Sequence, residues 1–402
     1  MNNYCLLSKI NQNVLNIRNY PYYIVPAGSM GVINSPSEFY SRLIEGIRGS
    51  RFRISLSTLY LGTGHLEKYL LDELLKVSNE NKYLKIKIVM DKFRGKRMGK
   101  NNESSYSLLK ELYMKSSNPQ NLTFSFFHHN DLPLNYDFIN KGGFAEILGT
   151  FHSKNYLFDN TVIISGANLS EEYFTHRTDR YMFFNNSSNL IDYVDDFIEI
   201  ATDLGEQINT YDKRFKLHLL NNQPSNSLNI YPLISNNDLN KIQFDNNDIK
   251  SKNEKFDFYN SGTNFKTNNQ SSIIESNIRD VLFNVKKLKD FQIEPILLEN
   301  SVVIPTNQIS MINNSEEENM FVLLLEFLKD LPLSVNAKLT FTTGYFNPPD
   351  HLINKFAQIK DNVKITFITA APKASSFYKA SGSRSIIPCL YRLALLKWVK
   401  AL

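Results

Sequence analysis

Hydrophobic and polar residues follow two different periods along residues 35–128. Apolar residues that recur every three or four positions predict helices, and those that recur every second position predict strands. Ser35 or Ser37, on either side of Pro36, is typical of a helix cap. In order, the pattern predicts a helix from Ser35 to about Gly49, a strand Arg51–Tyr60, a helix His65–Val77, a strand Lys85–Asp91, a helix Tyr106–Met114 and a strand Leu122–His128. This order predicts an α/β layer with at least some parallel strands.

A second α/β unit is predicted near the C-terminal end of the sequence. Its elements are a helix Phe321–Leu328, a strand Lys338–Tyr345, a helix His351–Ile359, a strand Val363–Ala370 and an apolar, basic helix Tyr391–Leu402. The two units resemble weak internal repeats, because each has a strand, a helix and a second strand of similar character. The second repeat is predicted to be truncated, since no strand with chemically active residues follows it.

The stretch between the two units breaks this pattern, because fourteen of the residues 221–270 are Asn. Such a composition buries too little apolar surface to offset the entropy of ordering, so we predict a disordered insert or linker. We therefore expect an N-terminal arm at 1–34, a first domain at 35–215, the insert at 216–271 and an incomplete second domain at 272–402. The arm lacks acidic residues and is also compatible with a mitochondrial transit segment.

Composition narrows the class of protein. Of 402 residues, 42% are hydrophobic and 21% are charged, which is ordinary for a globular protein with sizeable cores. The two cysteines, Cys5 and Cys389, exclude a disulfide framework and a Cys-rich zinc site. The net charge of +5 is compatible with a phosphate-bearing partner or an anionic membrane. No apolar run reaches the roughly 18 residues that a membrane-spanning helix needs.

Candidate chemistry is concentrated in a predicted hairpin at residues 152–168. His152 and Lys154 are two positions apart, a spacing that places both side chains on one face of a strand. Residues 159–160 are Asp-Asn and suit a two-residue turn, and Thr161–Ile164 would be the return strand. Asn168 at its end would lie near the first two residues. An imidazole can attack phosphorus, while an ammonium group, an amide and helix-start N–H groups bind its oxygens. The hairpin thus predicts a metal-free, cofactor-free site for phosphoryl or phosphatidyl transfer, in which Asp159 is either a turn residue or a catalytic one.

This stretch resembles the signature of the phospholipase D superfamily, His-x-Lys, four residues, Asp, then a small-residue turn and Asn. More specifically, it is similar to the eukaryotic CDP-diacylglycerol–glycerol-3-phosphate 3-phosphatidyltransferases. Further matching segments are Ser-Pro-Ser-Glu-Phe-Tyr (35–40), Ser-Thr-Leu-Tyr-Leu-Gly-Thr-Gly (57–64), Asp-Lys-Phe-Arg-Gly-Lys-Arg (91–97), Thr-Thr-Gly-Tyr-Phe-Asn (342–347) and Ala-Pro-Lys-Ala-Ser-Ser-Phe-Tyr (371–378). The resemblance covers about residues 30–210 and 320–390.

The resemblance implies a phospholipase D-like mixed sheet flanked by helices, built as two pseudo-repeats. It implies transfer of a phosphatidyl group from CDP-diacylglycerol to glycerol 3-phosphate, with release of CMP, by a peripheral protein of the mitochondrial inner membrane. Contact with an anionic membrane is expected, and nucleic acid is not expected as a partner. His152 would be the nucleophile, Lys154 and Asp159 the other catalytic members of the motif, and Asn168 and Ser170 would bind the phosphate.

A basic loop supplies further phosphate-binding candidates, namely Lys92, Arg94 and Arg97. It follows a predicted strand, and open α/β sheets bind ligands at the carboxyl ends of their strands. The alternative is a solvated charged loop.

The sequence departs from the family at two points. Ser-Gly-Ala-Asn (165–168) stands where the superfamily often has Gly-Ser or Gly-Gly, and no histidine after His152 is followed by Lys two positions later. The general acid that a second such motif would supply is then missing. Two alternatives to the transferase therefore stay open: a phospholipase D-type phosphodiesterase or hydrolase, and an inactive truncated form.

Overall fold

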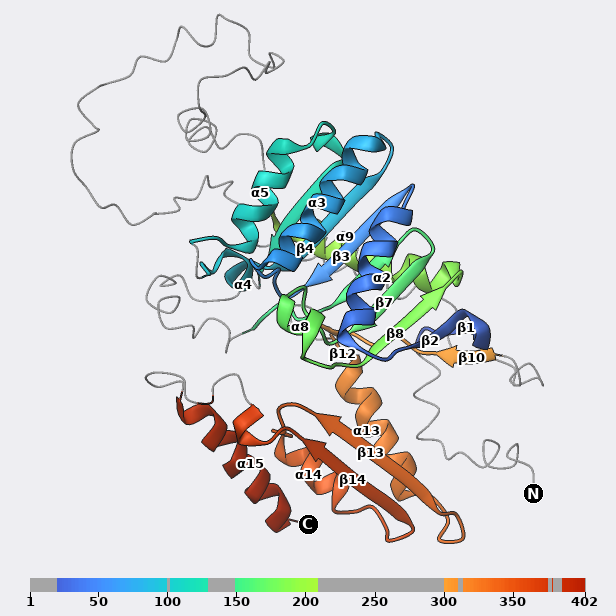
Figure 1. Cartoon of the computed structure of the whole chain (residues 1–402). Helices are drawn as coiled ribbons and strands as arrows, with labels where there is room; N and C mark the ends of the chain where they lie inside the picture. The colour runs from blue at the N-terminus through green and yellow to red at the C-terminus, as the bar shows by residue number, and fades with distance from the viewer. Residues whose placement is uncertain are drawn as a thin grey trace, which may run out of the picture.

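The computed structural model describes residues 20–99, 102–128, 149–208, 300–309, 314–374, 378 and 385–401. They form two units (Figure 1). The predicted insert at 216–271 lies outside the described residues, as does most of the predicted arm, residues 1–19.

The first unit is built on an eight-stranded mixed sheet with the order β2-β8-β7-β6-β3-β4-β5-β9. Only β3, β4 and β5 are mutually parallel, and all other neighbours are antiparallel. The strands are β2 (Met30–Ile33), β3 (Arg53–Thr58), β4 (Lys85–Asp91), β5 (Leu122–Phe127), β6 (Asn155–Phe158), β7 (Thr161–Ser165), β8 (Tyr181–Asn185) and β9 (Glu206–Gln207). The predicted parallel strands and the predicted mixed sheet are confirmed.

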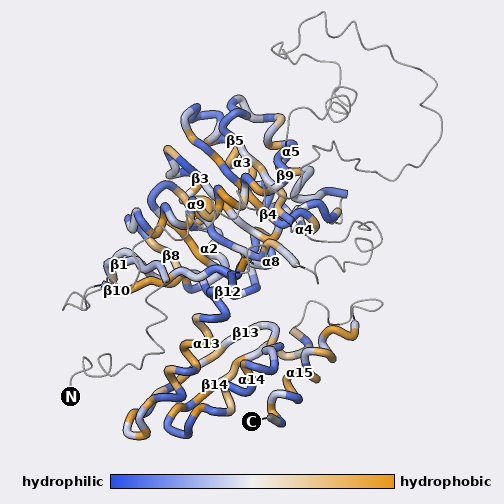
Figure 2. The backbone as a smooth tube through the Cα atoms, turned by 180° about the vertical axis from the view of Figure 1, so that it is seen from behind, coloured by the Kyte–Doolittle hydropathy of each residue, from blue (hydrophilic) through white to orange (hydrophobic). Residues whose placement is uncertain are grey.

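Helices cover both faces of this sheet. The face with α2 (Pro36–Gly49), α3 (His65–Glu80) and α5 (Ser105–Lys115) forms one core, in which Leu43, Leu70 and Leu109 are buried. The opposite face is covered by α9 (Ser188–Leu204), as the view from behind in Figure 2 shows, and α9 packs on the sheet through a second core. Two short helices, α4 (Lys92–Lys96) and α8 (Glu171–Thr175), lie at strand ends, and short 3-10 turns occur at Ala27–Ser29, Pro119–Asn121 and Pro372–Ala374.

The start of α2 confirms the capping signal in the sequence. The Ser35 hydroxyl accepts a hydrogen bond from the Glu38 backbone N–H at 3.1 Å, and Pro36 occupies the first helical turn. Because the first turn has no internal partners for its N–H groups, this cap fixes where the helix begins.

Part of the segment expected to be an N-terminal arm forms two strands. Strand β1 (Tyr23–Pro26) buries Tyr23 and Val25 by alternation and pairs antiparallel with β10 (Asn300–Val303), and β2 is an edge strand of the main sheet. The pairing of β1 with β10 also places residues 300–303 against the first unit rather than in the second domain that was expected to start at 272.

The second unit contains α13 (Glu316–Lys329), β13 (Ala337–Thr343), α14 (Asp350–Phe356), β14 (Val363–Thr369) and α15 (Ile387–Ala401). β13 and β14 are parallel, and Ala337 is paired with Val363. Phe346, Phe356 and Trp398 form the centre of its core. The short strands β11 (Gln308–Ile309) and β12 (Asn314–Ser315) precede α13. The predicted strand–helix–strand order is confirmed and matches β3–α3–β4 of the first unit.

Within the described residues, none of the helices is long and apolar enough to cross a membrane. No group of three His, Cys, Asp or Glu side chains there could hold a metal ion.

Candidate active site

The predicted hairpin lies at the edge of the sheet where β3 and β4 end. Because β6 runs antiparallel to β3 and pairs Asn155 with Ser57, residues 151–154 lie just beyond the carboxyl end of β3. β7 returns to the same edge, where the Ser165 N–H donates to the Lys154 carbonyl at 3.1 Å. The hairpin is confirmed, but its first strand begins at Asn155, so the strand spacing expected for His152 and Lys154 does not apply to them.

Lys154 is a buried cation, with 4% of its surface exposed. Its Nζ donates to the backbone carbonyl of His152 at 2.7 Å. Burial lowers the pKa of Lys154 to about 7; the carboxylates of Asp179 and Asp91 oppose this shift, while the Arg94 guanidinium adds to it. An ammonium with a pKa near neutrality and few protein partners is well suited to an anionic ligand.

His152 is exposed, yet protein surrounds enough of its ring to disfavour the charged form. This partial burial, together with the positive charges of Lys154 and Arg94, lowers the pKa of His152 to about 4. The imidazole is therefore neutral at physiological pH and keeps a lone pair for nucleophilic attack.

Asn168 and Ser170 follow β7 and are both buried. The Asn168 side-chain oxygen is buried and has no hydrogen-bond partner within the described ranges. The Ser170 hydroxyl lies 3.5 Å from the Tyr60 hydroxyl. The Gly62 N–H donates to the Leu169 carbonyl at 2.8 Å, which ties this segment to the end of β3. A buried acceptor without a partner is costly, so this oxygen is suited to a ligand group that donates a hydrogen bond, and the NH2 group of the same amide is the part that can donate to a phosphoryl oxygen.

Only part of the basic loop that carries Lys92, Arg94 and Arg97 interacts with the hairpin at this edge of the sheet. Arg94 lies close enough to lower the pKa of both His152 and Lys154, and its guanidinium lies 4.6 Å from the centre of the Tyr60 ring. Lys92 instead forms an ion pair with Glu206 at 3.0 Å, and Arg97 is exposed where α4 ends. Of the three candidates, Arg94 is the one with these electrostatic links to the hairpin.

Asp159 lies at the opposite end of β6 from His152. It occupies the hairpin turn with a φ of 47°, and its carboxylate accepts hydrogen bonds from the backbone N–H groups of Arg51, Phe52 and Arg53 at 2.7–2.9 Å. It lies five positions after Lys154 along extended chain, which corresponds to roughly 17 Å. The structure thus does not bring Asp159 to the other motif residues, and its contacts tie the turn to the start of β3.

Two carboxylates at this edge were not among the predicted site residues. Asp91, the last residue of β4, is 1% exposed, and Asp179 approaches Gly166 so closely that a Cβ there would lie 2.6 Å from its Oδ1. Both carboxylates raise the pKa of Lys154. Asp91 directly precedes a short basic helix and could have been recognised as its cap. For Asp179 no local signal distinguishes it from other acidic residues.

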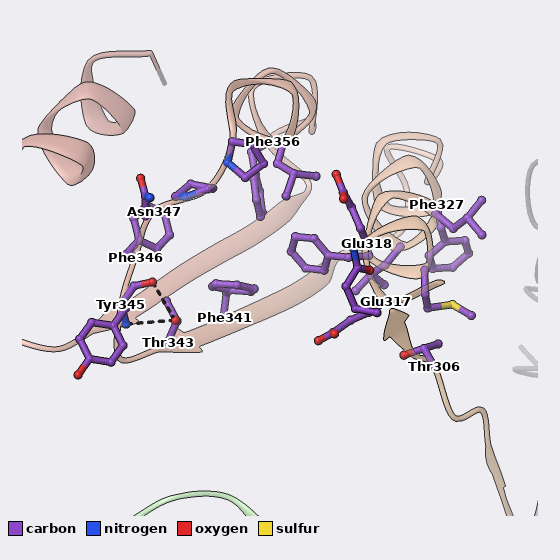
Figure 3. Close-up of a pocket in the computed structure, with 18 residues that line it drawn as sticks. Thr306, Glu317, Glu318, Phe327, Phe341, Thr343, Tyr345, Phe346, Asn347 and Phe356 are labelled. Atoms are coloured by element: carbon purple, nitrogen blue, oxygen red, sulfur yellow. Dashed lines mark hydrogen bonds between the residues drawn. The ribbon is translucent and has the colours of Figure 1, made fainter. Parts of the chain in front are cut away.

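The second unit contains a different hollow, an apolar pocket of about 880 Å³. In Figure 3, Phe341 of β13 and Phe356 of α14 face the helix α13, which carries Glu317 and Glu318 in its first turn. None of the predicted site residues lines this pocket.

This chain is similar in fold to a solved structure and similar in sequence to curated proteins. A solved structure of phosphatidylserine synthase from Haemophilus influenzae Rd KW20 matches 98% of this chain and 73% of that one, with a TM-score of 0.59 and 20% identity. Together with the mixed sheet flanked by helices, this match defines a phospholipase D-like fold. No family model matches the sequence.

Curated relatives narrow the resemblance further. A probable CDP-diacylglycerol–glycerol-3-phosphate 3-phosphatidyltransferase of Dictyostelium discoideum is 29% identical over 93% of this chain. The mitochondrial protein of that name from Gallus gallus is 28% identical, also over 93%. The resemblance drawn from the motifs is confirmed. The chain spans 58% and 64% of the lengths of these two relatives.

Proposed function

We propose that this chain transfers a phosphatidyl group from CDP-diacylglycerol to glycerol 3-phosphate, giving phosphatidylglycerophosphate and CMP. The observation that carries the proposal is the neutral, accessible imidazole of His152 beside the buried ammonium of Lys154. The names of the relatives support the choice of substrates. No cofactor or metal is required by this chemistry.

In the first step, a ring nitrogen of His152 attacks the phosphorus that carries the diacylglycerol group. A P–N bond forms and the P–O bond to CMP breaks, and CMP leaves with the electron pair. Lys154 and Arg94 balance the negative charge on the phosphoryl oxygens, and the side chains of Asn168 and Ser170 bind the remaining oxygens. Lys92 and Arg97 lie outside this set and are assigned at most to a more distant part of the nucleotide.

In the second step, the terminal hydroxyl of glycerol 3-phosphate attacks the same phosphorus. A P–O bond forms, the P–N bond breaks, and the electron pair returns to His152, while the hydroxyl proton passes to water or to a base. Transfer in two steps through a covalent intermediate predicts ping-pong kinetics.

We also propose that the protein acts in the mitochondrion, in peripheral contact with the anionic inner membrane. The name of the vertebrate relative supports the organelle. Helix α15 supports the membrane contact, because it exposes Leu393, Leu396 and Val399 beside Lys400. Cosedimentation with anionic vesicles, but not with neutral ones, is the expected result.

The function is tested by exchange of labelled CMP into CDP-diacylglycerol without any acceptor. The wild-type chain should catalyse exchange, and His152→Asn should abolish it. A matched control is His351→Asn, because His351 pairs with Glu318 in the second unit at 2.7 Å and lies outside the proposed site. Exchange that survives in His152→Asn contradicts the covalent role. Release of phosphatidic acid at the same rate with and without glycerol 3-phosphate would identify a hydrolase instead.

A further inference from the structure

A single buried carboxylate joins two parts of the candidate site. Asp91 Oδ1 accepts hydrogen bonds from the backbone N–H groups of Phe93 at 3.0 Å and Arg94 at 2.9 Å, which caps helix α4. Its Oδ2 accepts the backbone N–H of Phe151 at 2.9 Å. Phe151 directly precedes His152, so one carboxylate contacts the backbone of Arg94 and the backbone next to His152.

This contact fixes a segment that the sheet itself does not hold. Residues 151–154 precede the first residue of β6, so a regular ladder does not determine their path. Phe151 is buried, and its ring lies 5.4 Å from that of Phe127. The side-chain packing and the bond to Asp91 therefore set the backbone from which His152 projects.

We propose that Asp91 is a positioning residue of the phosphatidyl-transfer site, which holds the nucleophile His152 and the cation Arg94 in register with one another. This inference rests on the function proposed above. Asp91 touches neither substrate nor the reacting atoms, and it acts through the backbone N–H groups that it accepts. A displacement of about 1 Å between nucleophile and phosphorus is enough to cost roughly a hundredfold in rate.

The Asp91 carboxylate also contributes to the charge balance of Lys154. The charged groups that face Lys154 are Asp179 and Asp91, which favour its protonated form, and Arg94, which disfavours it. The neighbouring His152 is neutral at pH 7 and above. Removal of the Asp91 charge therefore lowers the pKa of Lys154 further, and activity that needs the ammonium is lost at a lower pH.

The test is Asp91→Asn. Asparagine is as good a helix cap as aspartate, so α4 is kept, but the amide offers one acceptor oxygen rather than two. We expect kcat for phosphatidyl transfer to fall by about 10- to 100-fold, and KM for CDP-diacylglycerol to change less than threefold. The alkaline limb of the pH–rate profile should move to lower pH. Asp91→Ser, whose side chain caps the helix but is shorter than that of Asp, should have the same effect.

Asp159→Asn is the matched control. Asp159 also accepts three backbone N–H groups, but at the far end of β6. Loss of its charge should lower stability and leave the pH profile unchanged. The same loss of kcat and the same shift in both variants would overturn the proposal, because both effects would then follow from a weakened sheet.

Amide hydrogen exchange separates this inference from the proposed function. In the wild-type chain, the Phe151 and Arg94 amides should be protected to a similar degree, because they share one carboxylate. Asp91→Asn should increase exchange at 151–154, and Asp159→Asn should not. If this pattern appears in a chain without transferase activity, the positioning role holds and the proposed function fails. An unprotected Phe151 amide in the wild-type chain would overturn the positioning role whatever the activity.

Discussion

The two units of this protein contain the same strand–helix–strand element in very different surroundings. In the first unit, five of the six residues of β3 are buried, because β4 and β6 pair with its two sides and helices cover both faces of the sheet. In the second unit, none of the residues of β13 is buried, and β14 is its one hydrogen-bonded neighbour among the described strands. The repeated element is thus a scaffold common to both units, whereas the hairpin β6–β7, which flanks the residues of the proposed site, belongs to the first unit.

The same difference is seen on the helical face. In the first unit, α8 packs against α2 and α3, and the Phe174 ring lies 4.7 Å from that of Tyr40 and 6.2 Å from that of Phe39. In the second unit, the space next to α13 and α14 is the apolar pocket of Figure 3. Helix α8, which packs there, begins directly after Ser170, so this packing lies next to the proposed site in the chain.

The largest expected effect is on packing, in Phe174→Ala. Phe174 is 2% exposed, and removal of a buried Phe side chain costs about 3–5 kcal/mol. Leu324→Ala in the second unit should cost less than about 1 kcal/mol, because Leu324 lines the open pocket and is 40% exposed. Denaturant unfolding measures both losses in the free energy of unfolding. Equal losses would mean that the region around Leu324 is as tightly packed as the region around Phe174.

Lys154→Met should separate function from stability. Loss of the cation should reduce transfer by about 10²–10³-fold, as for other groups that stabilise a transition-state oxyanion. The melting temperature should rise, because Met fills the site without the desolvation cost of a buried charge. Lys355→Met, which removes an ion pair with Glu326 in the second unit, should change the rate less than twofold. A Lys154→Met protein that is less stable than wild type would contradict this description of the site.

The pH dependence of the transfer rate follows from the side chains of His152 and Lys154. The proposed transfer requires neutral His152 and protonated Lys154, so kcat/KM should rise through pH 4 and fall through pH 7. Stability should behave differently above pH 7. The pKa of Lys154 is about 7 in the folded protein and 10.5 when unperturbed, so the unfolded chain binds more protons between these values and this lysine's contribution to stability rises with pH. Rate profiles and thermal melts across this pH range test the direction of the change in rate and of the change in stability. A rate that stays constant up to pH 9 would exclude a requirement for protonated Lys154.

The smallest expected effect is that of Gly166→Ala. The added Cβ would lie 2.6 Å from Asp179 Oδ1 and must displace this carboxylate, which supports the charge on Lys154. We expect a loss of transfer of about two- to threefold at neutral pH, with the alkaline limb moved by about half a pH unit, since half a unit of pKa corresponds to about 0.7 kcal/mol. Gly344→Ala is the matched control in the second unit, where a Cβ meets nothing within 4 Å. An identical profile in both variants would show that Asp179 does not act on Lys154.

Much of the fold could be predicted from the sequence, because its signals are local. The cap at Ser35 and the turn at Asp159 each depend on neighbouring residues, and each was found. Strand β3 was also found, although five of its six residues are buried and the expected alternation between buried and exposed positions is absent. The strand β1 was missed, since its partner β10 lies far away along the chain.

The residues of the candidate site also divide into those that local sequence predicts and those that only tertiary contacts reveal. His152, Lys154 and Asn168 lie on one hairpin, so their common location could be predicted. The contact between Asp91 and Phe151 joins two segments sixty residues apart, and no local pattern reports it. The Asp159 side chain accepts N–H groups more than a hundred residues earlier in the chain, and only tertiary structure reveals these partners.

The pairing of β1 with β10 has a consequence for how the molecule is assembled. A chain emerging from the ribosome completes this two-stranded ribbon only after Val303 has appeared, although Tyr23 is made at the very start. The ribbon is therefore completed late in synthesis, after strands β2 to β9 of the main sheet have all been made. The ribbon also links the two parts of the chain noncovalently. If the chain were cleaved between residues 208 and 300, the two fragments would be expected to associate through this strand pair.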